Sequence, residues 1–383
     1  MPPSFMKIIV SVPNADRFAG CAYYRSFQPH KVMAEKFNVP TLIVNGLKYL
    51  SDEQIREYDI FHCHKAWINE DYIDRAKRLG LKIIIDFDDY WRLPADHYLY
   101  NSYYWECGPD GRPLRKDGVK VKKLPSVTDR LIGILRLADF VTVTTDRLAH
   151  EVERINPNVC VLPNAIDVNS EQYKPKKIES SRIRIGWIGG HCHNNDIEEL
   201  IGLQNALRID PQTKGKYLIR LFGYDGSRAF RYFADIMSGN HNPGETNAEG
   251  FQVFRKADVW NYTEFYNHID IAIIPLVDNK FNSLKSELKV IEAGFFKKAA
   301  VVSNVDPYKS LLKHKENSLV VNKHSDWFRH LKYLIINPSE IQRLGENLYK
   351  DVQEFNQDKV SEKRFKFYER CLKEVPLKQP ALT

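Results

Sequence analysis

The 383-residue sequence has no long hydrophobic run and no closely paired cysteines. Because it lacks ~18 consecutive apolar residues, it predicts no membrane-spanning helix. The apolar stretch that follows Met6 is too short for a signal peptide, and we interpret it as a first strand. The six cysteines are scattered without a C-x-x-C spacing, which is typical of free thiols in a reducing compartment. We therefore expect a cytoplasmic protein.

Two common phosphate-binding motifs are also missing. The sequence contains neither G-x-G-x-x-G nor G-x-x-x-x-G-K-[ST], which argues against an NAD enzyme and a P-loop NTPase. The triplets His62–His64 and His191–His193 contain residue types that bind metals. Alternate residues of a strand point to opposite faces, so neither triplet presents three ligands together. We expect no metal site and no bound cofactor.

Length and charge give broader bounds. A chain of this length favours two domains, and 43% hydrophobic with 27% charged residues is typical of globular proteins. The net charge of +7 favours anionic partners mildly. A phosphate-bearing substrate, an anionic membrane surface and DNA are all compatible with it, so a peripheral association with membrane or nucleic acid stays open.

Short apolar segments alternate with amphipathic ones along most of the chain. We predict strands at Lys7–Val12, Thr41–Val44, Ile60–His64, Lys82–Phe87, Phe140–Thr144, Cys160–Leu162, Ile183–Ile188, Tyr217–Gly223, Phe251–Arg255, Ile271–Pro275, Ala299–Ser303 and Ser318–Val321. Predicted helices include Gln28–Phe37, Glu70–Leu79, Asp146–Ile155 and Asp196–Leu207. Such alternation predicts an α/β protein with parallel sheets and crossover helices.

The alternation occurs in both halves, which predicts two Rossmann-like domains facing across a cleft. We place the first domain at residues 1–170 and the second at 171–355, with a linker near Ala165–Ser181. A charged terminal helix at 356–383 would dock back on the first domain. An insertion at 98–125 interleaves aromatic and basic residues around a PDGRP turn. We expect an acceptor-side flap there; stacking on nucleic acid and a flap packed by its own tyrosines are both open.

One polar segment follows the predicted strand Ile271–Pro275. A helix that begins near Asn282 or Ser283 would carry Lys285, Lys289 and Glu292 at i, i+4 and i+7, so on one face. Two ammonium groups beside a helix N-terminus suit a diphosphate, and a carboxylate one turn further suits the hydroxyls of a ribose or sugar. An ordinary surface helix with an ion pair worth about 0.2–0.5 kcal/mol is the alternative.

Three segments in order carry a resemblance to a known family. They are ADFVTVTTDRLAHEV with VCVLPNAIDV, then IRIGWIGGHCHNND, then FNSLKSELKVIEAGFFKKAAVVSN with its Lys-Ser-x-x-Lys-x-x-Glu pattern. Together they resemble GT-B glycosyltransferases of the large retaining type called family 4, particularly bacterial and phage-encoded members. The resemblance implies a donor domain in the second half. Its donor-binding residues would be Gly189, Gly190, His193, Lys285, Ser286, Lys289 and Glu292.

The first domain supplies the remaining candidates. The resemblance places the loop of Gly20 near the donor sugar and implies that Arg25 faces the diphosphate; an ion-paired helix-start arginine is the alternative. Asp88 and Asp89 end a buried strand, where ligands of such sheets bind, and His64 ends the preceding one. We therefore predict Asp88, Asp89 and His64 as catalytic candidates, with a solvated turn as the alternative for the aspartates.

The sequence also departs from the family pattern. In the family pattern a first glutamate contacts the donor sugar, and Lys285 stands near that position here. We therefore expect the 284–287 backbone, or Asp278 and Asn279, to make the contact with the sugar. Arg220 and Arg228 are the candidates for an expected loop arginine. The sequence thus predicts a glycosyltransferase using a nucleotide-diphosphate sugar, with UDP as the favoured nucleotide, retaining and metal-independent. The expected acceptor is a glycan or a lipid-linked or cell-surface glycoconjugate; a transferase acting on hydroxymethylated DNA and a non-catalytic sugar-nucleotide-binding protein are the alternatives.

Overall fold

The computed structural model describes residues 6–14, 19–65, 69–239 and 250–377. The chain divides into two compact units. The first comprises residues 1–165, 284–286 and 357–383, and the second comprises residues 166–283 and 287–356. None of the described helices combines the length and apolarity that crossing a bilayer requires.

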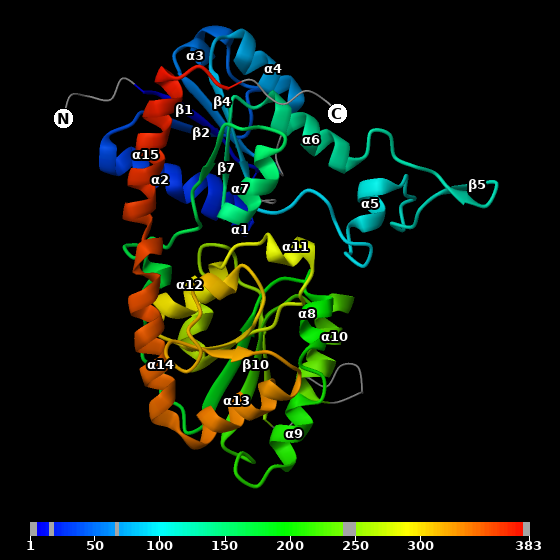
Figure 1. Ribbon diagram of the computed structural model, residues 1–383, viewed down its shortest axis with the longest axis vertical. Coiled ribbons are helices and arrows are strands. Elements are labelled where there is room, and N and C mark those ends of the chain that lie inside the picture. Colours follow the sequence, from blue (N-terminus) through cyan, green and yellow to red (C-terminus); the bar gives the residue numbers. More distant parts are fainter. Residues whose placement is uncertain (1–5, 15–18, 66–68, 240–249, 378–383) are drawn as a thin grey trace. The chain divides into compact units, whose positions relative to one another are not determined.

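The first unit is built on a parallel six-stranded sheet (Figure 1). Its order is β2-β1-β3-β4-β7-β8, formed by β1 (Ile8–Ser11), β2 (Thr41–Val44), β3 (Ile60–His64), β4 (Lys82–Phe87), β7 (Phe140–Val143) and β8 (Val159–Val161). Its helices are α1 (Gly20–Ala22), the π-helical turn η2 (Tyr23–Phe27), α2 (Gln28–Phe37), α3 (Asp52–Arg56), α4 (Glu70–Arg78), α5 (Tyr100–Tyr104), α6 (Val127–Leu137), α7 (Asp146–Glu153) and α15 (Gln357–Lys373).

The C-terminal helix α15 belongs to the core of this unit. It packs beside α2, where the rings of Phe37 and Phe365 stack at 4.5 Å. One turn along α15, the Tyr368 hydroxyl lies 2.9 Å from both His62 Nδ1 and His30 Nε2. These buried polar groups satisfy one another, which is the condition for placing them between a helix and a sheet. The helix therefore closes one face of the sheet.

The second unit repeats the plan. Its sheet has the order β11-β10-β9-β12-β13-β14, formed by β9 (Ile183–Ile188), β10 (Tyr217–Tyr224), β11 (Phe251–Arg255), β12 (Ile271–Ile274), β13 (Ala299–Ser303) and β14 (Leu319–Val321). Its helices are η4 (Glu171–Tyr173), α8 (Asn194–Glu198), α9 (Leu203–Ile209), α10 (Arg228–Ser238), η5 (Tyr262–His268), α11 (Lys280–Ser283), α12 (Leu288–Phe295), η6 (Tyr308–Ser310), α13 (Ser325–Ile336), α14 (Pro338–Asp351) and η7 (Val352–Phe355).

The predicted α/β fold is confirmed, and each predicted strand agrees with the structure within one residue at either end. The strands are continuous apolar runs buried on both faces, as in β12 and β13, which is the pattern of a covered parallel sheet. The predicted helix Asp196–Leu207 is wrong, because the chain forms α8 and α9 with a break between them. Gly202 lies at that break with φ of +80°, a left-handed conformation that interrupts a helix.

The insertion of the first unit has its own secondary structure. After α5 it forms an antiparallel hairpin of β5 (Arg115–Lys116) and β6 (Val119–Lys120), which projects from the body of that unit in Figure 1. At its base the Tyr104 hydroxyl accepts hydrogen bonds from the Leu93 amide at 3.3 Å and the Thr128 hydroxyl at 3.0 Å. The insertion therefore contains an anchored hairpin, and its own tyrosines also pack on one another at its base, with the ring centroids of Tyr100 and Tyr104 4.7 Å apart.

Candidate functional site

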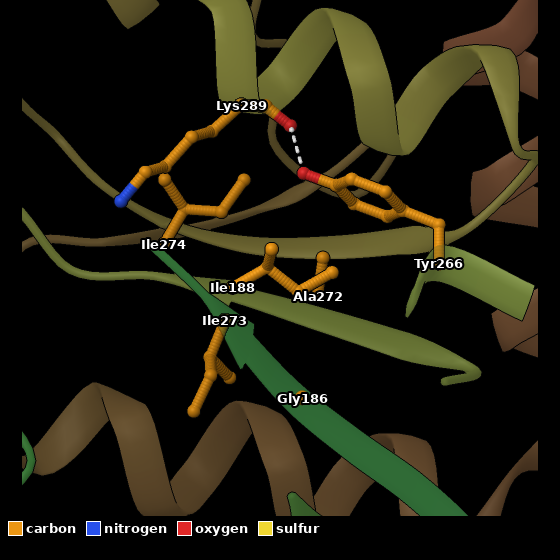
Figure 2. Close-up of a pocket in the computed structure, with 7 residues that line it drawn as sticks. All are labelled: Gly186, Ile188, Tyr266, Ala272, Ile273, Ile274 and Lys289. Atoms are coloured by element: carbon orange, nitrogen blue, oxygen red, sulfur yellow. Dashed lines mark hydrogen bonds between the residues drawn. The ribbon is translucent and has the colours of Figure 1, made fainter. Parts of the chain in front are cut away.

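The strand order of the second unit reverses between β9 and β12. In open parallel sheets, ligands bind outside the carboxyl ends of the strands at such a reversal. Gly189 and Gly190 directly follow β9 at that edge. A small pocket is lined by residues of these two strands, of η5 and of α12, and Figure 2 shows it beside the Lys289 side chain. It is lined by Gly186, Ile188, Tyr266, Ala272, Ile273, Ile274 and Lys289.

A chain of three polar side chains fixes Lys289 at this edge. The Lys289 ammonium lies 3.3 Å from His193 Nε2, and His193 Nδ1 lies 2.6 Å from Asp196 Oδ2. A carboxylate accepts from Nδ1–H, so the neutral imidazole has its lone pair on Nε2 and accepts from the ammonium. The other Asp196 oxygen accepts from the Val277 amide at 2.9 Å and from Asn282 at 3.3 Å. The relay thus ties together the loops after β9 and β12.

Packing restricts the same ammonium further. It lies 5.0 Å from the centroid of the Trp187 ring, a cation–π distance, and Trp187 is fully buried. A Cβ atom at Gly189 would come within 2.9 Å of the Lys289 nitrogen and 2.6 Å of the Trp187 ring. Only a glycine therefore fits between the lysine and the tryptophan at the end of β9.

Glu292, one turn beyond Lys289 on α12, is held by two phenols. The Tyr266 hydroxyl donates to Glu292 Oε2 at 3.0 Å, and the Tyr262 hydroxyl donates to Oε1. Tyr266 also lies 3.4 Å from the Lys289 carbonyl oxygen, the contact drawn in Figure 2. Burial and the nearby Glu292 carboxylate raise the pKa of Tyr266 well above its usual value, which keeps that phenol a donor. The Glu292 side chain is therefore oriented from within its own unit.

The predicted continuous donor helix is wrong. The chain forms the short helix α11, then a turn, and α12 begins only at Leu288, so Lys285 and Ser286 lie in the turn and do not share a helix face with Lys289. The residues 284–286 pack with the first unit, where Ser286 Oγ accepts from Asn164 Nδ2 at 2.8 Å. The first residue of α12 follows Glu287, whose side chain makes no capping bond.

The first unit brings His64, Lys65 and Asp88 together. Asp88 Oδ1 lies 2.9 Å from both His64 Nε2 and the Lys65 ammonium, and Asp89 lies 3.9 Å from that ammonium. Burial would raise the pKa of the Asp88 carboxyl, but Lys65 and then His64 hold it well below its usual value. Asp88 is therefore a weak base. His64, which is 1% exposed, contacts the Asp88 carboxylate from the buried side. Asp89 is the more exposed of the two carboxylates.

Arg25 does not present an open guanidinium, contrary to the role that the resemblance implies. It lies in the π-helical turn η2, 1% exposed, and forms a two-pronged ion pair with Asp86 at 2.8 and 2.9 Å. It also donates to the Leu162 carbonyl at 2.7 Å and to Asn164 Oδ1 at 3.2 Å. Burial would lower the pKa of Arg25, and the Asp86 carboxylate reverses the shift. The structure thus favours the alternative of a structural, ion-paired arginine.

The remaining candidates are placed as follows. Gly20 begins α1, and no described atom lies within 4 Å of a Cβ built there. The Arg220 guanidinium donates hydrogen bonds to Gln252 Oε1 and to the His268 carbonyl, whereas Arg228 is the first residue of α10. Asn279 caps α11 by accepting from the Asn282 amide at 2.8 Å. Among the described residues, no group of three or more His, Cys, Asp or Glu side chains could hold a metal ion.

Sequence reasoning missed four residues that the structure places at these clusters. They are Trp187, Tyr262 and Tyr266 around the lysine and glutamate of α12, and Lys65 beside Asp88. Lys65 directly follows His64 at a strand end, so its position was a usable signal. The two tyrosines have no such signal, because they lie in η5, 30 and 26 residues from Glu292 in sequence.

Solved structures of glycosyltransferases share this fold. A glycosyltransferase from Rickettsia africae ESF-5 is 12% identical with a TM-score of 0.59, over 96% of this chain and 99% of that chain. Sucrose-phosphate synthase from Thermosynechococcus elongatus is 13% identical with a TM-score of 0.64, over 95% and 98%. HepE from Anabaena, solved in complex with UDP-glucose, is 13% identical with a TM-score of 0.58, over 95% and 100%.

No protein-family model and no curated protein matches the sequence. The similarity therefore concerns the fold. Two parallel sheets, each with a reversal in its strand order, define the same fold. The chain has the GT-B fold of these glycosyltransferases.

Proposed function

We propose that the chain is a glycosyltransferase that moves a sugar from a nucleotide-diphosphate sugar to an acceptor hydroxyl. The observation that carries this proposal is the fixed ammonium of Lys289 beside the Gly189 backbone, at the strand-order reversal of the second unit. A fixed cation at such an edge suits the diphosphate of a donor. UDP is the nucleotide we favour, since the HepE structure that shares the fold contains UDP-glucose.

We assign a different part of the donor to each polar residue of α12. Lys289 would stabilise the charge that develops on the diphosphate as the glycosidic bond breaks, together with the Gly189 and Gly190 amides of the same unit. No metal ion is required in this scheme, because cationic side chains do that work. Cofactors other than the donor itself are not part of the proposal.

Glu292 would hold the ribose of the donor. Each carboxylate oxygen has two lone pairs, so an oxygen that accepts one phenol can still accept one ribose hydroxyl. Tyr262 and Tyr266 fix the direction of the remaining lone pairs. In this arrangement α12 would bind two parts of the donor. Lys289 would bind the diphosphate, and Glu292, one turn later, would bind the hydroxyls of the ribose ring.

We favour a retaining reaction. An inverting reaction needs a protein base of suitable pKa, and the pKa of Asp88, the less exposed of the two candidates, is held low by Lys65 despite its burial. In a retaining reaction the leaving phosphate takes the proton of the acceptor, so Asp88 and Asp89 would only orient the acceptor hydroxyl. The acceptor we propose is a glycan or a lipid-linked or cell-surface glycoconjugate.

The test is binding and slow hydrolysis of nucleotide sugars without an acceptor. A thermal-shift screen with UDP, GDP, ADP, CMP and their common sugar conjugates identifies the nucleotide. Isothermal titration and release of the nucleotide diphosphate then compare wild type with Lys289→Ala and with the exposed control Lys309→Ala. Loss of a charge-assisted contact is worth about 1.5–3 kcal/mol, so we expect a dissociation constant about tenfold to a hundredfold higher for Lys289→Ala only.

Each contrary outcome has a distinct meaning. An unchanged dissociation constant in Lys289→Ala would refute the donor site. Tight binding without hydrolysis or transfer to any acceptor would favour a non-catalytic sugar-nucleotide-binding protein. Transfer to hydroxymethylated duplex DNA would replace the proposed acceptor class.

A further inference from the structure

The hairpin of the first unit presents two chemically different faces. Its turn residues Asp117 and Gly118 have φ of +51° and +78°, the left-handed pair of a tight two-residue hairpin turn. Lys116 pairs with Val119, and Arg115 pairs with Lys120. Side chains alternate between faces along a strand and match across a pair. One pair therefore lies on each face.

The face of Val119 carries aliphatic side chains into solvent. Leu114, two residues before Lys116, shares this face, and its carbonyl accepts from the Val121 amide at 2.9 Å. Leu114 is 49% exposed and Val119 is 70% exposed, and Leu124 at the foot of the hairpin is 80% exposed. Exposing aliphatic side chains of a projecting element to water costs free energy, and a partner that covered them would recover it.

The other face is cationic. Arg115 and Lys120 are exposed there, and the Lys120 ammonium lies 5.3 Å from the centroid of Trp105. Between Arg112 and Lys123 the sequence has six basic residues against the single acidic residue Asp117, a local net charge of +5. The whole chain has a net charge of only +7, so this segment concentrates most of the excess.

We propose that this hairpin docks the protein on an anionic lipid surface. Basic residues are attracted to anionic headgroups, and aliphatic side chains between them gain by entering the boundary of the acyl chains. Lysine stems lie along apolar surface while their ammonium groups stay in water, which suits Lys116 beside Val119. The inference is independent of the proposed transfer reaction.

The exposed side chains favour lipid over nucleic acid. Binding of single-stranded nucleic acid uses aromatic rings on which bases stack. Here the Trp105 ring lies under Lys120, and the Tyr104 hydroxyl holds the base of the hairpin. The exposed apolar side chains of the hairpin, Leu114 and Val119, are aliphatic instead, and a phosphate backbone offers no apolar region for them to enter.

The test is co-sedimentation of the full chain with vesicles, without any nucleotide present. Vesicles of phosphatidylcholine alone are compared with vesicles of equal parts phosphatidylcholine and phosphatidylglycerol, at low and at high salt. Lys116→Glu with Lys120→Glu lowers the local net charge from +5 to +1, and Leu114→Ser with Val119→Ser removes the two exposed aliphatic side chains of the hairpin. Lys214→Glu with Lys216→Glu, both exposed in the second unit, is the matched charge control.

We expect wild type to bind only the anionic vesicles, less so at high salt. Each basic residue near an anionic surface is worth about 1 kcal/mol, so the hairpin charge variant should bind about thirtyfold more weakly or worse. The apolar variant should lose about tenfold. The control should stay within about twofold of wild type. Circular dichroism and the melting temperature confirm that each variant is folded.

Three results would overturn the proposal. One is equal or absent binding to the two vesicle types. Another is an apolar variant that binds anionic vesicles as well as wild type, since charge alone would then explain the attraction. The third is salt-dependent binding to duplex DNA or to an anionic polysaccharide that depends on the hairpin while vesicles stay unbound. Failure of donor hydrolysis would bear on the proposed function only.

Discussion

An alanine at Gly189 tests whether packing at the end of β9 places the Lys289 ammonium. The added Cβ would lie 2.6 and 2.8 Å from two carbons of the Trp187 ring and 2.9 Å from the Lys289 nitrogen. Carbon contacts of this length do not persist, so something must move. Trp187 is fully buried, so its ring has little room, and the lysine end and the loop backbone are the parts that can shift.

Two quantities should change together. Overpacking of this kind costs about 1–3 kcal/mol, so the free energy of unfolding in urea should fall by that amount. With Lys289 as the proposed donor ligand, displacement of its ammonium weakens a charge-assisted contact, so the dissociation constant for UDP should rise about tenfold or more. Gly190→Ala is the stability control, because no described atom lies within 4 Å of a Cβ there. Its unfolding free energy should be that of wild type.

The outcomes separate packing from direct ligand contact. If Gly189→Ala keeps both the stability and the UDP affinity of wild type, then the close approach of Gly189, Trp187 and Lys289 is not what places the lysine, and the reasoning is refuted. If Gly190→Ala keeps its stability but binds UDP weakly, the ligand itself approaches that backbone, as the proposed diphosphate site requires.

Three further predictions concern a buried ion pair, a close backbone contact and the hydrogen bond that orients Glu292. Asp86→Asn leaves Arg25 buried with a neutral partner, so urea unfolding near neutral pH should show a loss of about 3–5 kcal/mol. Burial would raise the pKa of Asp86 but Arg25 lowers it, so the pair stabilises fully above the unfolded pKa of about 3.9. As pH falls through the lower folded pKa the gap to wild type should close, and a constant gap would contradict this assignment. Gly345→Ala places a Cβ 2.1 Å from the Lys297 carbonyl oxygen and should cost about 3 kcal/mol; wild-type stability would show that this approach is absent. Tyr266→Phe should raise the UDP dissociation constant about fivefold to tenfold by leaving one Glu292 oxygen without its donor, and an unchanged titration would separate Glu292 from the donor.

The sheets were predictable because burial on both faces leaves a local mark. Runs such as IAII and AAVVS are apolar at every position, bounded by polar turns, and need no distant information to be recognised. The helices that flank them bury only one face against the sheet, so their sequences are amphipathic instead. The sequence therefore predicted where strands begin and end.

The break before α12 was not predictable, because no residue in the segment marks it. The segment NSLKSELK contains neither glycine nor proline, and its propensity favours a continuous helix. In the structure the turn is stabilised by distant contacts, such as the bond from Asn164 to Ser286, which lie far away in sequence. Tertiary contacts overrode local preference there, and the predicted single face of Lys285, Lys289 and Glu292 was lost with it.

Ion pairing explains why Arg25 departs from its expected role and why the pKa of Asp88 was not predictable. Arg25 and Asp86 are 61 residues apart, and nothing in either local pattern indicates that they meet. The strand-end position of Asp88 indicated a polar edge of the sheet. The pKa of Asp88 depends on Lys65, and the sequence does not show which way the Lys65 side chain points. Position along a strand is thus readable from sequence, whereas the protonation behaviour of a buried carboxylate depends on its partners.

The proposed role of Lys289 depends on preorganisation rather than on the number of charges. Lys289 is held by His193 and by the Trp187 ring, and His193 is held in turn by Asp196. A cation already fixed in place stabilises a developing charge without the cost of reorienting when the bond breaks. A lysine on an exposed helix would have to be ordered first, losing side-chain entropy on binding. The polar chain behind Lys289 is therefore what distinguishes this residue from the many other basic residues of the sequence.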